Sequence, residues 1–302
     1  MSSPQLITVY GATGAQGGSV VQSLLQNKSQ AFKIRGITRN PDSDKAKALK
    51  EQGCRSHDPA VNQSGGPSET DLGKSLVDAA AEAGVRHFVY SGMASASEIT
   101  GGSVPNKAFE EKHAIGEYAK SKGVFETVNI VSPGWYMENH LVEEVAPVLG
   151  GFPFVPDEEG YLTLHIPRWG GNDEIPFISI GDDYGDLVHG IFLDPSKHNG
   201  RLTQGISSSS KPEQLVSDFE KRPGSCPIED WKTMETYGVE AFETVKYMFG
   251  FCQHSGGLYY GVPNDVDTTG ELKAKAAEAK GESGDNAKLM TLERFLRKYF
   301  AL

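Results

Sequence analysis

A glycine-rich turn at residues 11–18, GATGAQGG in one-letter code, constrains the fold more than any other part of the sequence. It follows an apolar run over 6–10 that predicts a buried strand, and it precedes apolar residues at helical spacing over 19–25. A strand, a glycine turn and a helix in this order form the context in which a dinucleotide-binding fingerprint occurs. A glycine-rich surface loop is the alternative, which the flanking elements make the weaker one.

Each of the three glycines at this spacing has a distinct role in binding a dinucleotide. Gly11 permits the tight turn, Gly14 lets the backbone approach a pyrophosphate, and Gly17 lets the helix pack on the strand. The helix that follows presents unpaired N–H groups and the positive end of its dipole to the phosphates. The sequence therefore predicts a pyrophosphate site at the start of this helix.

The residue after the second expected strand indicates which dinucleotide is bound. Residues 32–38 alternate like a strand, and Arg39 follows them. At this place an Asp or Glu accepts from the 2′-hydroxyl of NAD, whereas an Arg accommodates the 2′-phosphate of NADP. The next acid is Asp42, so we expect NADP(H) in preference to NAD(H). A solvated arginine at a strand end is the alternative.

The segment after the second expected helix is too short for the usual fold. Residues 54–70 separate a helix over 45–52 from the next one, over 71–83. A strand–helix–strand unit normally takes about 30 residues, and at best 60–62 form the end of a strand. We therefore expect the third strand, its helix and most of the fourth strand to be missing, which opens the sheet beside the first strand. A defective gene product is one interpretation of this gap.

The rest of the chain continues an α/β pattern. Strands are expected over 85–91 and 125–131 and a helix over 107–122, and after residue 140 the signals become shorter and more mixed. The expected fold class is α/β, a Rossmann-type doubly wound parallel sheet with a smaller C-terminal α/β region. We divide it into a dinucleotide-binding domain, 1–140, and a region, 141–302, some of whose segments return to the sheet.

Composition limits the possible partners and compartments. The net charge of −11 argues against direct binding of nucleic acid, and it permits a basic protein partner. No apolar run approaches the ~20 residues that span a bilayer, so we expect no membrane association. The start of the chain lacks the pattern of a signal peptide. Cys54, Cys226 and Cys252 lack metal-ligand spacing, which predicts free thiols in the cytoplasm and no metal site.

Several separate motifs, in order, resemble the NmrA-like family of atypical extended short-chain dehydrogenases. They are GATGAQGG at 11–18, Thr38-Arg39, Gly73-Lys74 with LVDAA at 76–80, HFVYSG at 87–92, PGWYMEN at 133–139, IGDDYG at 180–185 and TLERF at 291–295. The resemblance implies a Rossmann domain, a smaller C-terminal region and a cleft between them. The family includes NADP-binding transcriptional co-regulators and redox sensors, and relatives of isoflavone-reductase type that are true reductases.

The resemblance also implies individual contacts to the cofactor. They fall at Gly11, Thr13, Gly14, Gln16, Gly17 and Arg39. Lys112 occupies the place of the family lysine that reaches the nicotinamide ribose, and it is our candidate for a catalytic residue.

The usual catalytic pair of the superfamily is incomplete in this chain. A tyrosine four residues before the lysine normally moves the proton, and here that position holds Ala108. A literal Tyr-x-x-x-Lys does occur at Tyr118 and Lys122. It begins ten residues beyond Ala108, about 15 Å further along the helix axis. We interpret it as a chance match, because the cofactor is expected at the start of this helix.

Other candidates lie at the nicotinamide end of the expected site. Ser91 ends a strand where these enzymes place a Ser or Thr, although it could equally cap a turn. Trp135, Tyr136 and Asn139 are expected to line the cleft. Packing between the two regions is an equally good interpretation of Trp135 and Tyr136.

Two functions follow from these observations. The first is an NADP(H)-binding regulator that reports the redox state of its cofactor to a protein such as a transcription factor, with weak or no dehydrogenase activity. It is favoured by Ala108 and the acidic charge, and it would act in the cytoplasm and also in the nucleus. The second is an NADP-dependent reductase of a small secondary metabolite, which uses Lys112 or another cleft residue as the acid.

Overall fold

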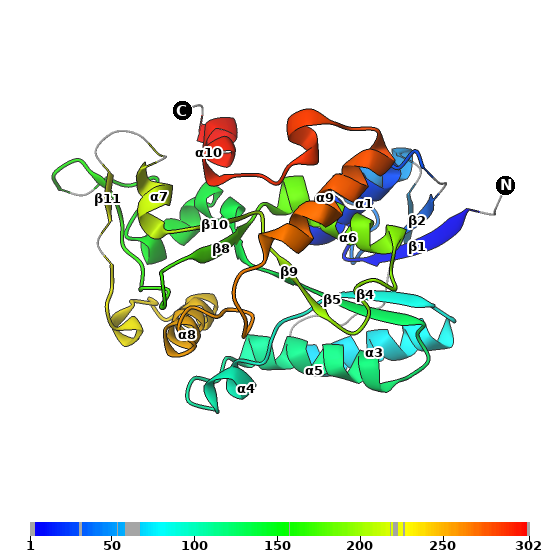
Figure 1. Cartoon of the computed structure of the whole chain (residues 1–302), viewed down its shortest axis with the longest axis horizontal. Coiled ribbons are helices and arrows are strands. Elements are labelled where there is room, and N and C mark those ends of the chain that lie inside the picture. Colours follow the sequence, from blue (N-terminus) through cyan, green and yellow to red (C-terminus); the bar gives the residue numbers. More distant parts are fainter. Residues whose placement is uncertain are drawn as a thin grey trace.

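Two parallel three-stranded sheets form the scaffold of the protein (Figure 1). The computed structural model describes residues 4–29, 32–52, 54–57, 67–156, 158–217, 219, 223–225 and 227–300. In the first sheet β1 (Gln5–Tyr10) pairs with β2 (Phe32–Ile37), which pairs with β3 (Arg55–His57). In the second sheet β5 (Thr127–Pro133) lies between β4 (His87–Ser91) and β9 (Leu202–Gly205).

The order of these strands confirms a Rossmann-type sheet that is open in the middle. Among the described residues no strand pairs with the free edge of β1 or with that of β4. The usual order places the fourth strand at this point, so its expected loss agrees with the structure. The expectation that the third strand is missing is wrong, because three residues of β3 still pair with β2. The expected strand end at 60–62 lies outside the described residues.

Helices lie on both faces of the scaffold, although the second face of β1 is left uncovered (Figure 1). On one face α1 (Ala15–Leu25), α6 (Gly185–Leu193) and α9 (Val266–Lys280) pack together. On the other face α3 (Glu69–Glu82) lies beside α5 (Lys107–Ser121) under the second sheet. Segments from the C-terminal half of the chain therefore complete the N-terminal fold.

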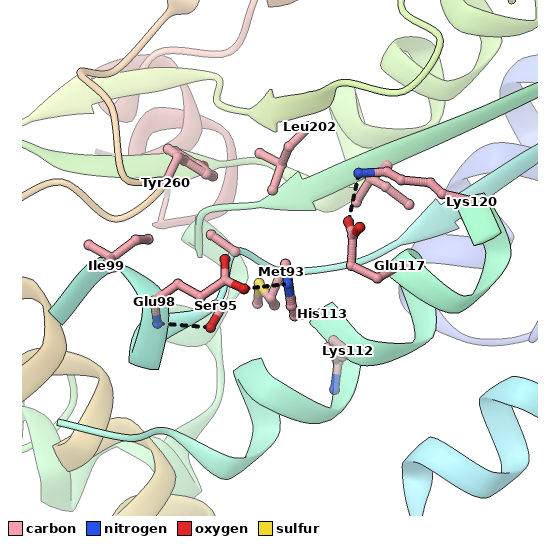
Figure 2. A pocket seen from close by; sticks show the side chains of 13 residues that line it. Met93, Ser95, Glu98, Ile99, Lys112, His113, Glu117, Lys120, Leu202 and Tyr260 are labelled. Atoms are coloured by element: carbon pink, nitrogen blue, oxygen red, sulfur yellow. Dashed lines mark hydrogen bonds and ion pairs between the residues drawn. The ribbon is translucent and has the colours of Figure 1, made fainter. Parts of the chain in front are cut away.

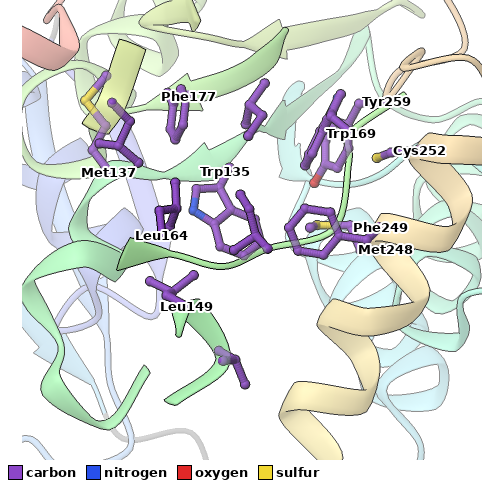
Figure 3. Close-up of a cluster of buried hydrophobic side chains, with 14 of the residues drawn as sticks. Trp135, Met137, Leu149, Leu164, Trp169, Phe177, Met248, Phe249, Cys252 and Tyr259 are labelled. Atoms are coloured by element: carbon purple, nitrogen blue, oxygen red, sulfur yellow. The ribbon is translucent and has the colours of Figure 1, made fainter. Parts of the chain in front are cut away.

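A smaller α/β region packs around an aromatic core at the other end of the molecule (Figures 1 and 3). Trp135, Trp169, Phe177, Phe249 and Tyr259 belong to this core, and their burial holds the short elements of the region together. One of its two sheets contains β6 (Trp135–Tyr136), β8 (Ile175–Ile178) and β10 (Ser208–Ser210), and the other pairs β7 (Leu162–Leu164) with β11 (Pro223–Ser225).

The other helices of the chain, in both parts of the fold, are α2 (Asp44–Glu51), α4 (Ala96–Thr100), η1 (Met137–Leu141), η2 (Glu143–Leu149), η3 (Ile180–Tyr184), α7 (Pro212–Ser217), η4 (Trp231–Thr233), α8 (Glu240–His254), η5 (Gly284–Ala287) and α10 (Leu292–Phe300).

One face of β1 is exposed as a consequence of the shortened segment. Ile7 and Val9 are buried against α1, whereas Leu6 and Tyr10 on the opposite face are 52% and 44% exposed. Figure 1 shows α3 and α5 beneath β4 and β5 rather than beneath β1. A helix of the missing unit would normally cover this second face, so apolar side chains there meet water.

Because the side chain of Leu6 is exposed, we expect it to contribute little to the stability of the protein. The substitution Leu6→Ala should change the free energy of unfolding by less than about 0.5 kcal/mol, as at an ordinary surface position. Ile7→Val, the matched change on the buried face, should cost about 0.5–1.5 kcal/mol. Urea unfolding of both variants measures the difference. A cost for Leu6→Ala above that for Ile7→Val would mean that this face is covered in solution.

Cys54 and Cys252 are buried, and neither forms a disulfide within the described residues. Cys226 lies outside those residues. Among the described residues no group of three His, Cys, Asp or Glu side chains could hold a metal ion. The same part of the chain contains no helix that is long and apolar enough to cross a bilayer.

Candidate functional site

The glycine turn has the geometry that its sequence predicts. Gly11 has φ of +73°, in the left-handed region that favours glycine. A Cβ atom on Gly17 would lie 2.2 Å from the carbonyl oxygen of Gly11, so no larger residue fits there without a shift of the backbone. The amides of Gly11 and Ala12 both donate to the carbonyl of Ile37, at 2.9 and 3.1 Å. The turn is therefore fixed against the end of β2.

The first turn of α1 is open to an anion. Gly14 is the N-cap residue, no side chain caps this end, and the first turn contains no acidic residue. The leading amides of a helix have no partner within the helix, and together with the dipole they attract negative charge. The close approach at Gly17 and the uncapped helix fit the pyrophosphate of a dinucleotide.

The end of β2 provides the expected ribose side of this site. Thr38 follows β2 and its hydroxyl lies 2.8 Å from that of Thr13 in the glycine turn. The next residue, Arg39, is exposed, and it makes no hydrogen bond or ion pair within the described residues. An arginine with an unengaged guanidinium at this place fits a phosphate on the ribose.

Two side-chain contacts join the glycine-turn end of the fold to more distant segments. Gln16 donates a hydrogen bond to the hydroxyl of Tyr136, so α1 and β6 meet at this point. Burial raises the pKa of Tyr136, although the bond from Gln16 opposes this shift. Burial also raises the pKa of Tyr184 in η3, although a hydrogen bond with Ser91, at the end of β4, opposes this shift. Both tyrosines are therefore neutral at physiological pH.

Lys112 projects from the first half of α5 and forms an ion pair with α3. Its Nζ donates to both carboxylate oxygens of Glu69, at 2.7 and 2.9 Å. The two side chains are 29% and 42% exposed, so water partly screens their attraction. The structure therefore gives the candidate catalytic lysine a carboxylate partner from the helix that follows the shortened segment.

A cavity of about 210 Å³ lies beside this lysine, on the side of α5 that faces β5 and β9 (Figure 2). Its walls combine apolar side chains such as Met93 and Leu202 with charged ones that pair with each other. His113 lies 3.6 Å from Glu98, and Lys120 lies 2.8 Å from Glu117. Lys112 also lines this cavity, but in Figure 2 its amine points away from Ser95 and Glu98, and it bonds Glu69 of α3.

The literal Tyr-x-x-x-Lys motif at Tyr118 and Lys122 forms a separate surface cluster. Tyr118 donates to Asp78 of α3 at 2.9 Å, and Lys122 lies 2.5 Å from the same carboxylate. These bonds hold the pKa of Asp78 below its usual value. Asp78 lies nine residues after Glu69 on α3, so the cluster is more than two helical turns from Lys112. The structure thus places this motif away from the candidate Lys112.

The structure thus brings together part of the predicted site. Gly11, Thr13, Gly14, Gln16 and Gly17 form one surface with Arg39 beside it and Tyr136 bonded to it. Asn139 lies in η1 and is half-buried, and no hydrogen bond within the described residues joins it to the glycine turn. Trp135 packs in the aromatic core with its ring 5.6 Å from that of Phe249.

Sequence reasoning missed two partners of the candidate residues. Tyr184, which bonds Ser91, stands in the IGDDYG motif that carried the family resemblance, so the motif could have indicated it. Glu69 had no such signal, because it is 43 positions away from Lys112 in the sequence and lies among ordinary helix-forming residues.

The fold and the glycine turn define a Rossmann-type α/β protein with the features of a dinucleotide site. A family model described as the NmrA-like family matches residues 3–55 and 60–284, and the chain belongs to this family. It is 43% identical to NmrA-like family domain-containing oxidoreductase FrzB of Cladobotryum sp, over 98% of each chain. It is 41% identical to the oxidoreductase of the same description, hkm9, of Aspergillus hancockii, over 98% of this chain and 97% of that one.

A solved structure supports the same fold. The crystal structure of NmrA, a negative transcriptional regulator, in complex with NADP matches 99% of this chain and 96% of its own, with a TM-score of 0.72. The same regulator has also been solved with NAD. The sequence identity is 18%, so this likeness shows the fold alone.

The comparison with FrzB also shows a difference in length. The alignment spans 332 positions, whereas 98% of this 302-residue chain is about 296 residues. About 36 positions of the alignment therefore have no residue of this chain. The family match is interrupted at residues 56–59, a gap that begins within β3. In a Rossmann-type sheet the loss of the fourth strand leaves the edge of β1 open, as it is among the described residues.

Proposed function

We propose that this protein is an NADP(H)-binding oxidoreductase that acts on a small organic substrate. The observation that carries the proposal is the glycine turn, where Gly17 approaches Gly11 so closely that only glycine fits, in front of an uncapped helix. The NmrA-like family membership supports it, as do two relatives of nearly full length that are described as oxidoreductases.

Different residues of this chain would bind different parts of the dinucleotide. The leading amides of α1 would hold the pyrophosphate, and Arg39 would pair with the 2′-phosphate. Lys112 would hold the nicotinamide ribose or give up a proton from Nζ near it. Bound NADPH supplies the hydride. Ser91, Tyr136 and Asn139 are proposed for the same end of the site.

Calorimetric titration with NADPH, NADP+, NADH and NAD+ tests this proposal and its preference for NADP(H). We expect Arg39→Ala to weaken NADPH binding about tenfold and to leave NADH binding unchanged, because the lost contact is a charged hydrogen bond to the 2′-phosphate. Arg35→Ala removes the same charge from within β2 and should change neither affinity. Absence of binding to all four ligands would overturn the proposed function.

A redox-sensing regulator is the second candidate function. Ala108 removes the usual proton-transferring tyrosine, and Glu69 already binds the ammonium of Lys112. Both features favour binding of the dinucleotide over its turnover. The net charge of −11 suits a basic protein partner such as a transcription factor, rather than direct contact with nucleic acid. This function would place the protein in the cytoplasm and in the nucleus.

Turnover separates the two candidates. A panel of small carbonyl and enone compounds with NADPH should give steady oxidation of the cofactor if the protein is a reductase, and Lys112→Ala should abolish it. Binding of NADPH without turnover of any compound would favour the regulator. In that case the affinities for NADPH and NADP+ must differ, because a sensor has to distinguish the two redox states.

A further inference from the structure

In its ion pair with Glu69, the ammonium of Lys112 is already bonded, and this ammonium is the group proposed to bind the nicotinamide ribose. Glu69 is the first residue of α3, and the side chain of Ser68 caps this helix by accepting from the amide of Asp71. The cap fixes the first turn of α3, and it thereby fixes the position of the Glu69 carboxylate. Both oxygens of this carboxylate accept from Nζ of Lys112.

The neighbouring charges make this pairing specific. On the same stretch of α5, His113 faces Glu98, and Lys120 pairs with Glu117. Because Glu98 and Glu117 pair with these other residues, Glu69 is the carboxylate within the described residues that bonds Lys112. Nζ has three N–H donors and Glu69 accepts two of them, so a ribose that takes two hydrogen bonds from this ammonium has to displace a charged acceptor. Bonds to charged acceptors are about twice as strong as those to neutral ones.

We propose that Glu69 is a positioning residue that competes with the nicotinamide ribose for Lys112 and so lowers the affinity of this chain for the reactive half of NADP(H). The proposal rests on the proposed binding of NADP(H). The adenosine half would lie at the glycine turn and Arg39, and no hydrogen bond or ion pair within the described residues joins Glu69 to them. The competition therefore affects one half of the ligand and spares the other.

Two ligands separate these halves in an experiment. NADPH contains the nicotinamide ribose, whereas 2′,5′-ADP contains only the adenosine with its two phosphates. We expect Glu69→Gln to tighten NADPH binding about two- to fivefold, in keeping with the strength of a half-exposed ion pair. Binding of 2′,5′-ADP should stay the same, although it carries negative charge as well. Calorimetry of both ligands gives the measurement.

Two further variants control for charge and for mechanism. Glu117→Gln removes the same charge from a Glu–Lys pair on α5 and should leave both affinities unchanged. In a Lys112→Met background, Glu69→Gln should no longer tighten NADPH binding, because the residue on which it acts is absent. Equal tightening of both ligands by Glu69→Gln, or tightening that persists without Lys112, would overturn the proposal.

The outcomes also separate this proposal from the proposed function. If wild-type protein and variants bind neither ligand, the proposed function fails and the competition fails with it. If both ligands bind and Glu69→Gln leaves NADPH affinity unchanged, the competition alone is wrong. Thermal unfolding of each variant shows that it is folded, and Glu69→Gln keeps the size of the side chain and the position of the N-terminal turn.

Discussion

Replacing Gly17 with alanine should weaken NADPH binding about a hundredfold or more and destabilise the fold by about 1–3 kcal/mol. The added Cβ would lie 2.2 Å from the carbonyl oxygen of Gly11 and 2.7 Å from its carbonyl carbon. Both atoms belong to the backbone of the turn, so a side chain cannot move aside to make room. The start of α1 would shift away from β1, and the leading amides would lose their alignment with the pyrophosphate.

The adjacent glycine offers a matched control. A Cβ on Gly18 would lie 3.5 Å from the carbonyl oxygen of Ala12, which is an ordinary contact distance. Gly18→Ala should therefore retain NADPH affinity and raise helix stability slightly, because alanine is the better helix former. Calorimetry and urea unfolding of both variants measure the two effects. Equal binding by Gly17→Ala and wild type would refute the assignment of the phosphate site to this turn.

The parts of the site that were predicted from the sequence are those encoded by short motifs. The glycine turn and the strand end at Arg39 each depend on a few consecutive residues, and the order of strands then places them together. The open edge of β1 could be predicted as well, because the number of residues between two helices limits what can fold there. The three residues of β3 were missed, since a strand this short has no periodicity to detect.

The contacts that determine chemistry could not be predicted in the same way. The bond between Lys112 and Glu69 depends on how α3 packs beside α5, and the bond between Ser91 and Tyr184 depends on how η3 meets β4. Neither relation is visible in local spacing. The side chain of Trp135 illustrates the same limit, because only the packing of the C-terminal region decides that its ring lies in a core.

A buried charge network should make Asp186 the most sensitive polar position in the C-terminal half. Asp186, Lys273 and Lys280 are 3%, 5% and 6% exposed, and the carboxylate lies 2.7 Å from Lys273 and 2.8 Å from Lys280. Ser23 of α1 also donates to it, at 2.5 Å. The network therefore joins α6 and α9 to the helix that begins at the glycine turn.

The substitution Asp186→Asn should lower the free energy of unfolding by about 3 kcal/mol at pH 7, because it leaves two buried ammonium groups with less compensation. Lys273 keeps Asp183 at 3.0 Å and Lys280 keeps Glu282 at 2.9 Å, which places the cost near the lower end for broken buried pairs. Asp285→Asn breaks an exposed pair with Lys288 and should leave the midpoint of urea unfolding unchanged. An equal effect of the two substitutions would contradict the role of the network.

The difference in unfolding free energy between wild type and Asp186→Asn should depend on pH, because the carboxyl group of Asp186 titrates. Burial alone would raise the pKa of Asp186, but the ammonium groups of Lys273 and Lys280 and the hydroxyl of Ser23 outweigh it, and the net pKa lies below the usual value. A carboxyl with a lowered pKa in the folded state stabilises the protein above its unfolded pKa of about 3.9 and loses this contribution as the pH falls through the folded value. The gap in unfolding free energy between wild type and Asp186→Asn should therefore be constant from pH 7 to about pH 5 and shrink below about pH 4. Urea unfolding at a series of pH values measures it, and a gap that widens on acidification would show that the neutral carboxyl, rather than the carboxylate, stabilises the network.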